Sequence, residues 1–225
     1  MDPRAFVRAS VGAVAAMSAS DDDRLRGGLT SKSDTTSESA LPLVPVDEAV
    51  RLGEKLGIDR PYATSNVYRA LLNSPSATAG FYGLVNALFF RNKVAARTRE
   101  LIVLRIGWRA GSEYVFCNHV RFSKDLGIPD EEILGVRDPR RCHAYSNTDR
   151  AVLQLADELH EHAQVSRSTW AMLEKAFARD ELVELLLIAG FWRMAAGFVK
   201  SIKIPLDDDV ASWPEGRKPD DLVPK

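Results

Sequence analysis

Residues 96–110 decide the fold of this chain, and they read ARTRELIVLRIGWRA. The centre of the stretch, from residue 101 to residue 108, is apolar on nearly every side. A helix with apolar residues all round is buried in a protein core. Read alone, the run also fits a buried strand, but its length with flanking residues and its leucine content favour a helix. We therefore predict a buried helix over residues 96–110.

The segments around this helix are also helical in pattern. Gly111 interrupts the chain, and Ser112 then offers a natural N-cap, with Glu113 in the first turn. Ser146 and Asp149 form a capping box that starts a later helix, and Ser166 can cap the helix after it. Apolar residues at helical spacing predict further helices near residues 46–56, 65–72, 76–89, 166–177 and 182–202. No segment alternates with period two between hairpin turns, so we predict an all-α fold of roughly eight helices.

The first 41 residues differ in composition from the rest of the chain. They contain three consecutive aspartates, a Gly-Gly pair and a run rich in Ser and Thr, with few large apolar residues. Such segments do not bury enough apolar surface to offset ordering, so we predict a disordered extension over 1–41. A helical domain follows over 42–225, ending in a mostly extended tail from residue 213. A targeting peptide in residues 1–20 is the alternative to a cytoplasmic protein.

Composition excludes several classes of protein. The 225 residues are 45% hydrophobic and 27% charged, with a formal net charge of −1, as in ordinary soluble domains. A near-zero net charge argues against an extended nucleic-acid footprint. We find no apolar run that approaches the ~20 residues that a membrane-spanning helix needs, so we expect no membrane partner. Two cysteines exclude a disulfide framework and any four-cysteine metal site within one chain.

The usual motifs for metal, phosphate and thiol chemistry are missing. His160 and His162 lie two residues apart, so on a helix they diverge and do not share an ion. We therefore predict no metal site. No phosphate-binding glycine loop and no serine-nucleophile elbow is present. Cys117 and Cys142 lack a C-x-x-C spacing, and Cys117 diverges from His119 on its helix, so we read both as inert thiols.

Four polar residues remain on the two helices that Gly111 joins: Glu100, Arg105, Glu113 and His119. The Gly111 break lets the helices fold back and brings Glu100 near His119. A carboxylate in such apolar packing loses water, so we expect its pKa to rise into a range useful for proton transfer. The alternative is structural: Glu100 is solvated or paired with Arg97 or Lys93, and His119 is a satisfied core histidine.

At these residues the sequence resembles the carboxymuconolactone decarboxylase and alkylhydroperoxidase D family. The resemblance covers about residues 65–212, and its motifs occur in the family's order. It is carried by residues 99–105, 108–114, His119, 156–160, 165–170, 181–190 and 205–208. It implies an alkylhydroperoxidase D-like (AhpD-like) helical bundle that assembles as homo-oligomers, either trimers or hexamers.

The resemblance also assigns positions in the site. The peroxidase branch uses a glutamate, then C-x-x-C, then a histidine four residues after the second cysteine. By position, the glutamate and histidine fall on Glu100 and His119, but the cysteine positions hold Ser112 and Val115. Without a low-pKa thiolate the dithiol mechanism has no nucleophile.

The decarboxylase branch fits what is left, and it implies a lyase without metal or organic cofactor. The expected substrate is a small carboxylated lactone or enolisable ring. Glu100 and His119 then handle protons, and Glu113 is a secondary catalytic group. Arg105 or Arg109 holds a substrate carboxylate, because a guanidinium matches its two oxygens. Trp108 and Ser112 complete the expected substrate-binding set.

Two other functions stay open at this point. One is a peroxidase-type redox protein, which the absence of both family cysteines opposes. The other is a non-enzymatic helical binding or assembly subunit, which predicts that no polar pair lies in an apolar pocket. The distance between Glu100 and His119 in the folded chain separates these alternatives.

Overall fold

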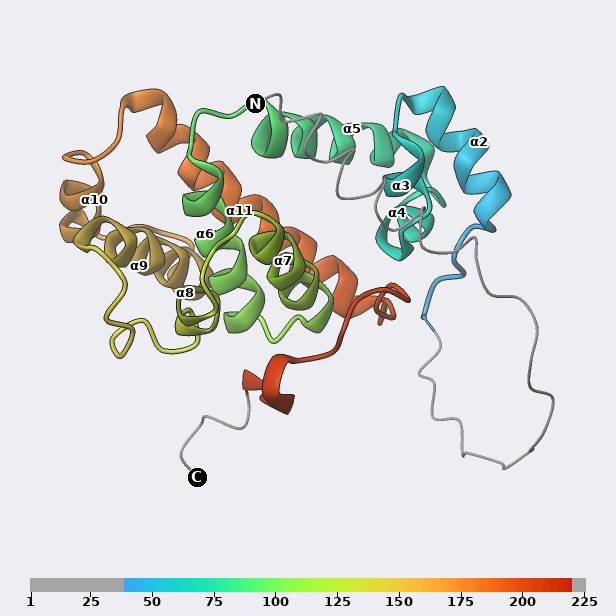
Figure 1. The fold of residues 1–225 in the computed structure, drawn as a ribbon. Helices are drawn as coiled ribbons and strands as arrows, with labels where there is room; N and C mark the ends of the chain where they lie inside the picture. Colours follow the sequence, from blue (N-terminus) through green and yellow to red (C-terminus); the bar gives the residue numbers. More distant parts are fainter. Residues whose placement is uncertain (1–38, 220–225) are drawn as a thin grey trace. The chain divides into compact units, whose positions relative to one another are not determined.

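The computed structural model describes residues 39–219, and within them the chain forms ten α-helices, one π-helical turn and one 3₁₀ turn, with no strand (Figure 1). The α-helices are α2 (Val46–Leu56), α3 (Arg60–Ala63), α4 (Asn66–Leu71), α5 (Pro75–Val85), α6 (Ala96–Arg109), α7 (Glu113–Asp125), α8 (Asp130–Gly135), α9 (Asn147–His162), α10 (Arg167–Leu173) and α11 (Arg179–Ser201). The π-helical turn η1 is Asn86–Phe90, and the 3₁₀ turn η2 is Pro214–Gly216.

The predicted all-α fold class is confirmed, with more helices than the expected eight. One addition is α3, a single turn of four residues, which is too short to show a helical period. Three predicted caps are present, because Ser112, Ser146 and Ser166 each accept a backbone N–H three residues ahead. The helix expected from residue 76 begins at Pro75, since proline suits the first helical position.

The central helix is α6, as its apolar sequence predicts. Every residue from Arg99 to Trp108 is buried. Helices α7, α9 and α11 pack around it (Figure 1). Helix α7 approaches α6 closely at Gly107, where an added Cβ would lie 3.0 Å from the Phe116 nitrogen. Gly111 reverses the chain between the two helices with a left-handed φ of 59°, a conformation that glycine adopts without strain.

The end of the chain departs from the expected extended tail. Trp213 is 8% exposed, and its ring packs 5.3 Å from Phe116 and 5.8 Å from Trp108. The turn η2 follows directly after it. An isolated tryptophan gives no periodic signal, so the sequence did not indicate that this segment covers the outer side of α6 and α7.

Helix α11 corrects the expectation that no segment is long and apolar enough to cross a membrane. Its 23 residues meet that criterion by length and composition. Half of its most apolar window is buried inside the fold, and core helices of soluble proteins pass the same test. Leu185, Ile188 and Ala196 of α11 are fully buried against the other core helices.

The predicted disordered extension over 1–41 lies mostly outside the described residues, which begin at Ser39. Residues 39 and 40 contact the end of α11: the Ser39 hydroxyl and the Ala40 N–H both donate to the Ile202 carbonyl. The boundary between residues 41 and 42 and the targeting-peptide alternative therefore stay predictions.

Candidate functional site

The turn at Gly111 brings Glu100 of α6 and His119 of α7 together. Glu100 Oε2 lies 2.7 Å from His119 Nδ1. Glu100 is fully buried, and His119 is 7% exposed. The sequence predicts this approach, because the helix break allows α7 to fold back along α6.

Arg99 provides the second partner of Glu100. Its Nε donates to Glu100 Oε1 at 3.0 Å, and its Nη1 donates to the Phe89 carbonyl at 2.9 Å. The guanidinium also lies over the Phe89 ring, 3.9 Å from its centroid. Both carboxylate oxygens of Glu100 thus accept from a nitrogen donor in a dry environment.

These donors correct the expected pKa of Glu100. Burial alone would raise this pKa, as the sequence suggests. The charges and hydrogen bonds of His119 and Arg99 outweigh burial and hold the pKa of Glu100 below its ordinary value. Glu100 is therefore a carboxylate near neutral pH, and it is suited to stabilise a cation on His119 rather than to donate a proton.

Trp192 of α11 determines the tautomer of His119. Its indole Nε1 lies 2.9 Å from His119 Nε2. An indole N–H only donates hydrogen bonds, so Nε2 is the acceptor and carries no proton. The proton of the neutral imidazole is then assigned to Nδ1, from which it donates to Glu100. The four groups form one chain of hydrogen bonds, from Arg99 through Glu100 and His119 to Trp192.

Aromatic rings surround the imidazole of His119. The ring centroids of Phe122, Trp192 and Phe89 lie 5.5, 5.6 and 6.3 Å from it. Phe89 comes from η1, and single π-helical turns recur at functional sites. The aromatic cage, defined as Phe89, Phe122 and Trp192, gives the pair an apolar wall on sides contributed by η1, α7 and α11.

The two arginines predicted to hold a substrate carboxylate are paired elsewhere. Arg105 donates from Nε and Nη2 to the two oxygens of Asp157, at 2.7 and 2.9 Å. Arg109 lies 3.3 Å from Asp157 and 2.9 Å from Glu161. Both face α9 rather than α7, so the contacts give no support to their predicted role as substrate-binding residues.

The other three predicted site residues also lie outside the Glu100–His119 pair. Trp108 packs against Phe116 and Trp213. Glu113 accepts a hydrogen bond from the Ser212 hydroxyl. Ser112 is fully buried and caps α7 through the Val115 N–H at 3.4 Å. Ser112 thus has a structural role as the N-cap of α7, and Glu113 has one as a partner of the C-terminal segment, so neither contact requires a catalytic role.

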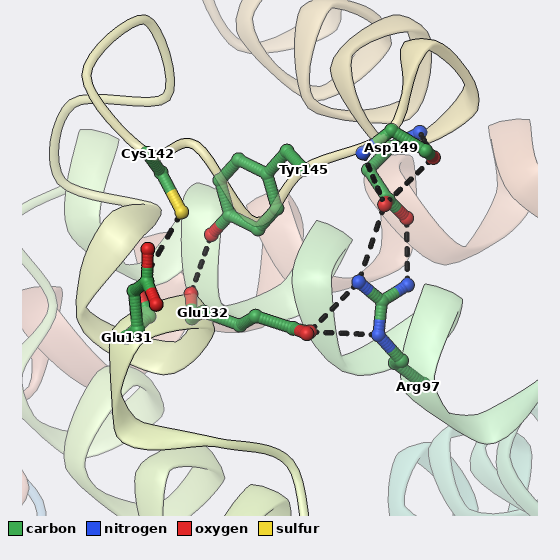
Figure 2. A network of polar contacts seen from close by, with 7 residues as sticks. Arg97, Glu131, Glu132, Cys142, Tyr145 and Asp149 are labelled. Carbon is green, nitrogen blue, oxygen red and sulfur yellow. Dashed lines mark hydrogen bonds and ion pairs between the residues drawn. The ribbon is translucent and has the colours of Figure 1, made fainter.

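The basic residues that could have paired with Glu100 are bound to other acids. Figure 2 shows Arg97 between Asp149 and Glu132, with nitrogen–oxygen distances of 2.7 Å to each. Lys93 pairs with Asp180. Glu100 pairs instead with Arg99, a partner that the sequence does not indicate because adjacent helical residues point in different directions.

The cysteines do not supply a reactive thiol. Cys117 is 3% exposed, and burial together with the nearby Glu113 charge raises its pKa to about 12. Cys142 is also buried, and both are free. Among the described residues no group of three or more His, Cys, Asp or Glu side chains is arranged to hold a metal ion.

Sequence reasoning missed Arg99, Trp192 and the two phenylalanines of the aromatic cage. Trp192 lies 73 residues from His119, and nothing in the local pattern of α11 marks it. The helical period does place Trp192 on the buried side of α11, but burial alone does not reveal a hydrogen bond.

Comparisons with known proteins show what part of the chain and its fold are similar to. Residues 75–158 match the model of the carboxymuconolactone decarboxylase family. No curated protein sequence matches the chain. A peroxidase-related protein from a Silicibacter species has a similar structure, with a TM-score of 0.64 and 17% identity over 78% of this chain and 97% of its own.

Two further solved structures are similar. The alkylhydroperoxidase AhpD core of a peroxidase-related protein from Ralstonia eutropha has a TM-score of 0.61 and 17% identity, over 76% of this chain and 93% of its own. A cysteine-to-alanine variant of the debrominase Bmp8, bound to 2,3,4-tribromopyrrole, has a TM-score of 0.63 and 14% identity, over 78% and 95%. Residues 75–158 are thus similar to the carboxymuconolactone decarboxylase family, and the helical body has the AhpD-like fold.

Proposed function

We propose that this protein is a cofactor-free lyase that uses Glu100 and His119 for acid/base chemistry on a small carboxylated lactone or enolisable ring. The observation that carries the proposal is the buried 2.7 Å contact between Glu100 Oε2 and His119 Nδ1. A base that is oriented by a carboxylate on its other nitrogen is the arrangement that general base catalysis requires.

In this proposal Nε2 of His119 is the reacting nitrogen. It takes a proton from a ring carbon next to a carbonyl, and the electron pair of the broken C–H bond moves into that carbonyl. The imidazolium keeps its Nδ1–H on the carboxylate of Glu100, which stabilises the new positive charge in a low-dielectric site. A decarboxylation starts instead without loss of a ring proton. The C–C bond to the carboxylate breaks, CO₂ leaves, and the electron pair of that bond moves into the conjugated carbonyl to form an enolate. A proton that Nε2 of His119 takes from water is then delivered to the ring carbon.

Similarity to this family supports a decarboxylase-like or alkylhydroperoxidase-like role, and the thiol positions favour the first. Ser112 and Val115 occupy the two positions where the resemblance requires cysteines. Cys117 is buried with a raised pKa, so it offers little thiolate. A non-catalytic binding subunit would need no ionised pair in its core, since such a pair is costly to bury.

The test is turnover by the full-length chain on a panel of small unsaturated or carboxylated rings. The panel contains unsaturated γ-lactone carboxylates, ring β-keto acids and brominated pyrroles, the last because a structural neighbour binds one. We expect Glu100→Gln and His119→Ala to lower kcat by about 10²–10⁴-fold, the usual contribution of a positioned acid or base. Glu174→Gln and His162→Ala, both on exposed residues, are the matched controls.

Full activity of both site variants would remove Glu100 and His119 from the mechanism. The redox alternative has its own arm, in which hydroperoxide is supplied with a thiol reductant. Turnover that Cys117→Ser abolishes would favour that alternative over the lyase. The expected small-molecule substrate, homo-oligomeric assembly and cytoplasmic location belong to the same proposal.

A further inference from the structure

His119 has no free ring nitrogen in this structure. Nδ1 is bound to Glu100 and Nε2 to Trp192. The rings of Phe89 and Phe122 lie beside the imidazole, and His119 is 7% exposed. In the proposed function, Nδ1–H keeps its hydrogen bond to Glu100 in order to stabilise an imidazolium. The reacting proton must then reach Nε2, and the indole N–H covers that nitrogen.

We propose that Trp192 is a positioning residue that gates His119, so that a ligand reaches Nε2 only by displacing the indole. The proposal rests on the proposed function, because it takes Nε2 as the reacting nitrogen. In the closed state the indole N–H donates to Nε2 of His119, the ring nitrogen that does not contact Glu100. The base is thus prepared before the ligand arrives.

The shape of the gate defines the ligand class. The group that leaves Nε2 is a flat bicyclic ring, and its ring neighbours are Phe89 at 6.3 Å and Phe191 at 4.9 Å. We therefore expect the ligand to be a flat unsaturated ring no larger than indole, which would take the place of the displaced side chain against Phe89 and Phe191. The ligand also needs a hydrogen at the edge of its ring. This hydrogen first donates a hydrogen bond to Nε2, in place of the indole N–H, and is then transferred to Nε2 as a proton.

The gate can be tested without a known substrate. Diethyl pyrocarbonate acylates an unprotonated imidazole nitrogen that it can reach, and peptide mass spectrometry reports the rate at each histidine. The exposed His143 and His162 serve as internal references in the same protein. In the wild-type chain we expect His119 to react at least about ten-fold more slowly than His143, because reaction requires local opening.

Two variants open the gate by different amounts. Trp192→Ala removes the ring, and we expect His119 to react at a rate near that of His143. Trp192→Phe keeps a ring but removes the N–H, and the loss of one hydrogen bond should raise the rate about five-fold, which corresponds to about 1 kcal/mol. Trp170→Ala removes a tryptophan on α10 whose indole bonds Glu174, and it should leave the rate unchanged.

Global unfolding is excluded within each sample by the buried thiol of Cys117, which a thiol reagent labels only in an opened chain. The gate is supported if Trp192→Phe and Trp192→Ala both accelerate labelling of His119 while Cys117 stays protected. It is overturned if wild-type His119 reacts as fast as His143, or if a folded Trp192 variant reacts at the wild-type rate. Loss of turnover in His119→Ala and Glu100→Gln, measured in samples whose Cys117 stays protected, tests the proposed function separately, because labelling needs no catalysis.

Discussion

Removing the charge of Glu100 with Glu100→Gln should strongly destabilise the fold. The side chain of Glu100 is fully buried and that of Arg99 is 6% exposed, so water screens neither charge. In the variant, Arg99 keeps its charge in the core with only uncharged partners: the new side-chain amide, the Phe89 carbonyl and the Phe89 ring. Breaking a buried ion pair by removing one partner costs about 3–5 kcal/mol, and we expect a loss of unfolding free energy in that range.

A double-mutant cycle separates this ion pair from general damage. Arg99→Met should cost a similar amount, because Glu100 then keeps only His119 as a partner. The double variant Arg99→Met/Glu100→Gln contains neither stranded charge, so its loss should fall short of the sum of the two single losses by about 2–3 kcal/mol. The assay is urea unfolding followed by far-ultraviolet circular dichroism, with free energies from linear extrapolation. Losses that add within about 0.5 kcal/mol would refute the reasoning, because they would show that Arg99 and Glu100 act independently.

Three further predictions concern acid unfolding, two helical glycines and the assembly of the chain. The pKa of Glu100 is lowered in the folded chain, so its stabilising contribution is fully present above its unfolded pKa and is lost as the pH falls through its lower folded pKa. Acid unfolding should therefore be less steep in Glu100→Gln than in the wild type, when both are followed by circular dichroism. Gly107→Ala should lower the free energy of unfolding by about 1–3 kcal/mol, because the new Cβ meets the Phe116 backbone at 3.0 Å. Its control is Gly80→Ala on α5, where a Cβ has no neighbour within 4 Å, and this change should raise the free energy of unfolding by up to about 1 kcal/mol. Thermal or urea unfolding measures both. The homo-oligomer that the resemblance implies should bury the exposed apolar residues of α11, which include Leu187. Leu187→Glu should therefore lower the mass that light scattering measures. An unchanged mass would place the interface elsewhere.

The sequence alone identified the main framework of the fold. The all-round apolar run of residues 101–108 marked α6 as the central helix, and hydroxyl caps marked the starts of α7, α9 and α10. These features are local, because hydrophobic period and capping act within a few residues. For the same reason the one-turn helix α3 and the buried Trp213 were missed: one is shorter than a period, and the other has no period at all.

In the candidate site, too, the sequence predicts what local features determine and misses what distant contacts determine. Glu100 and His119 could be nominated from sequence because one turn at Gly111 connects their helices, and the shape of that turn is a local property of glycine. The roles suggested for Arg105 and Arg109 failed to match the contacts, because a positive charge in a sequence does not reveal which acid it will meet. Asp157, the shared partner of both, lies on α9, about fifty residues away.

The sequence by itself determined an all-α chain, a buried central helix and the absence of cysteines at the two positions where thiol chemistry would need them. Only the tertiary structure decided the state of the pair. Burial was expected to raise the pKa of Glu100, but Arg99 and His119 lower it, and Trp192 fixes the tautomer of His119 from a helix 73 residues further along. Protonation depends on which donors and charges surround a buried group within a few ångströms, and packing of distant helices sets those neighbours.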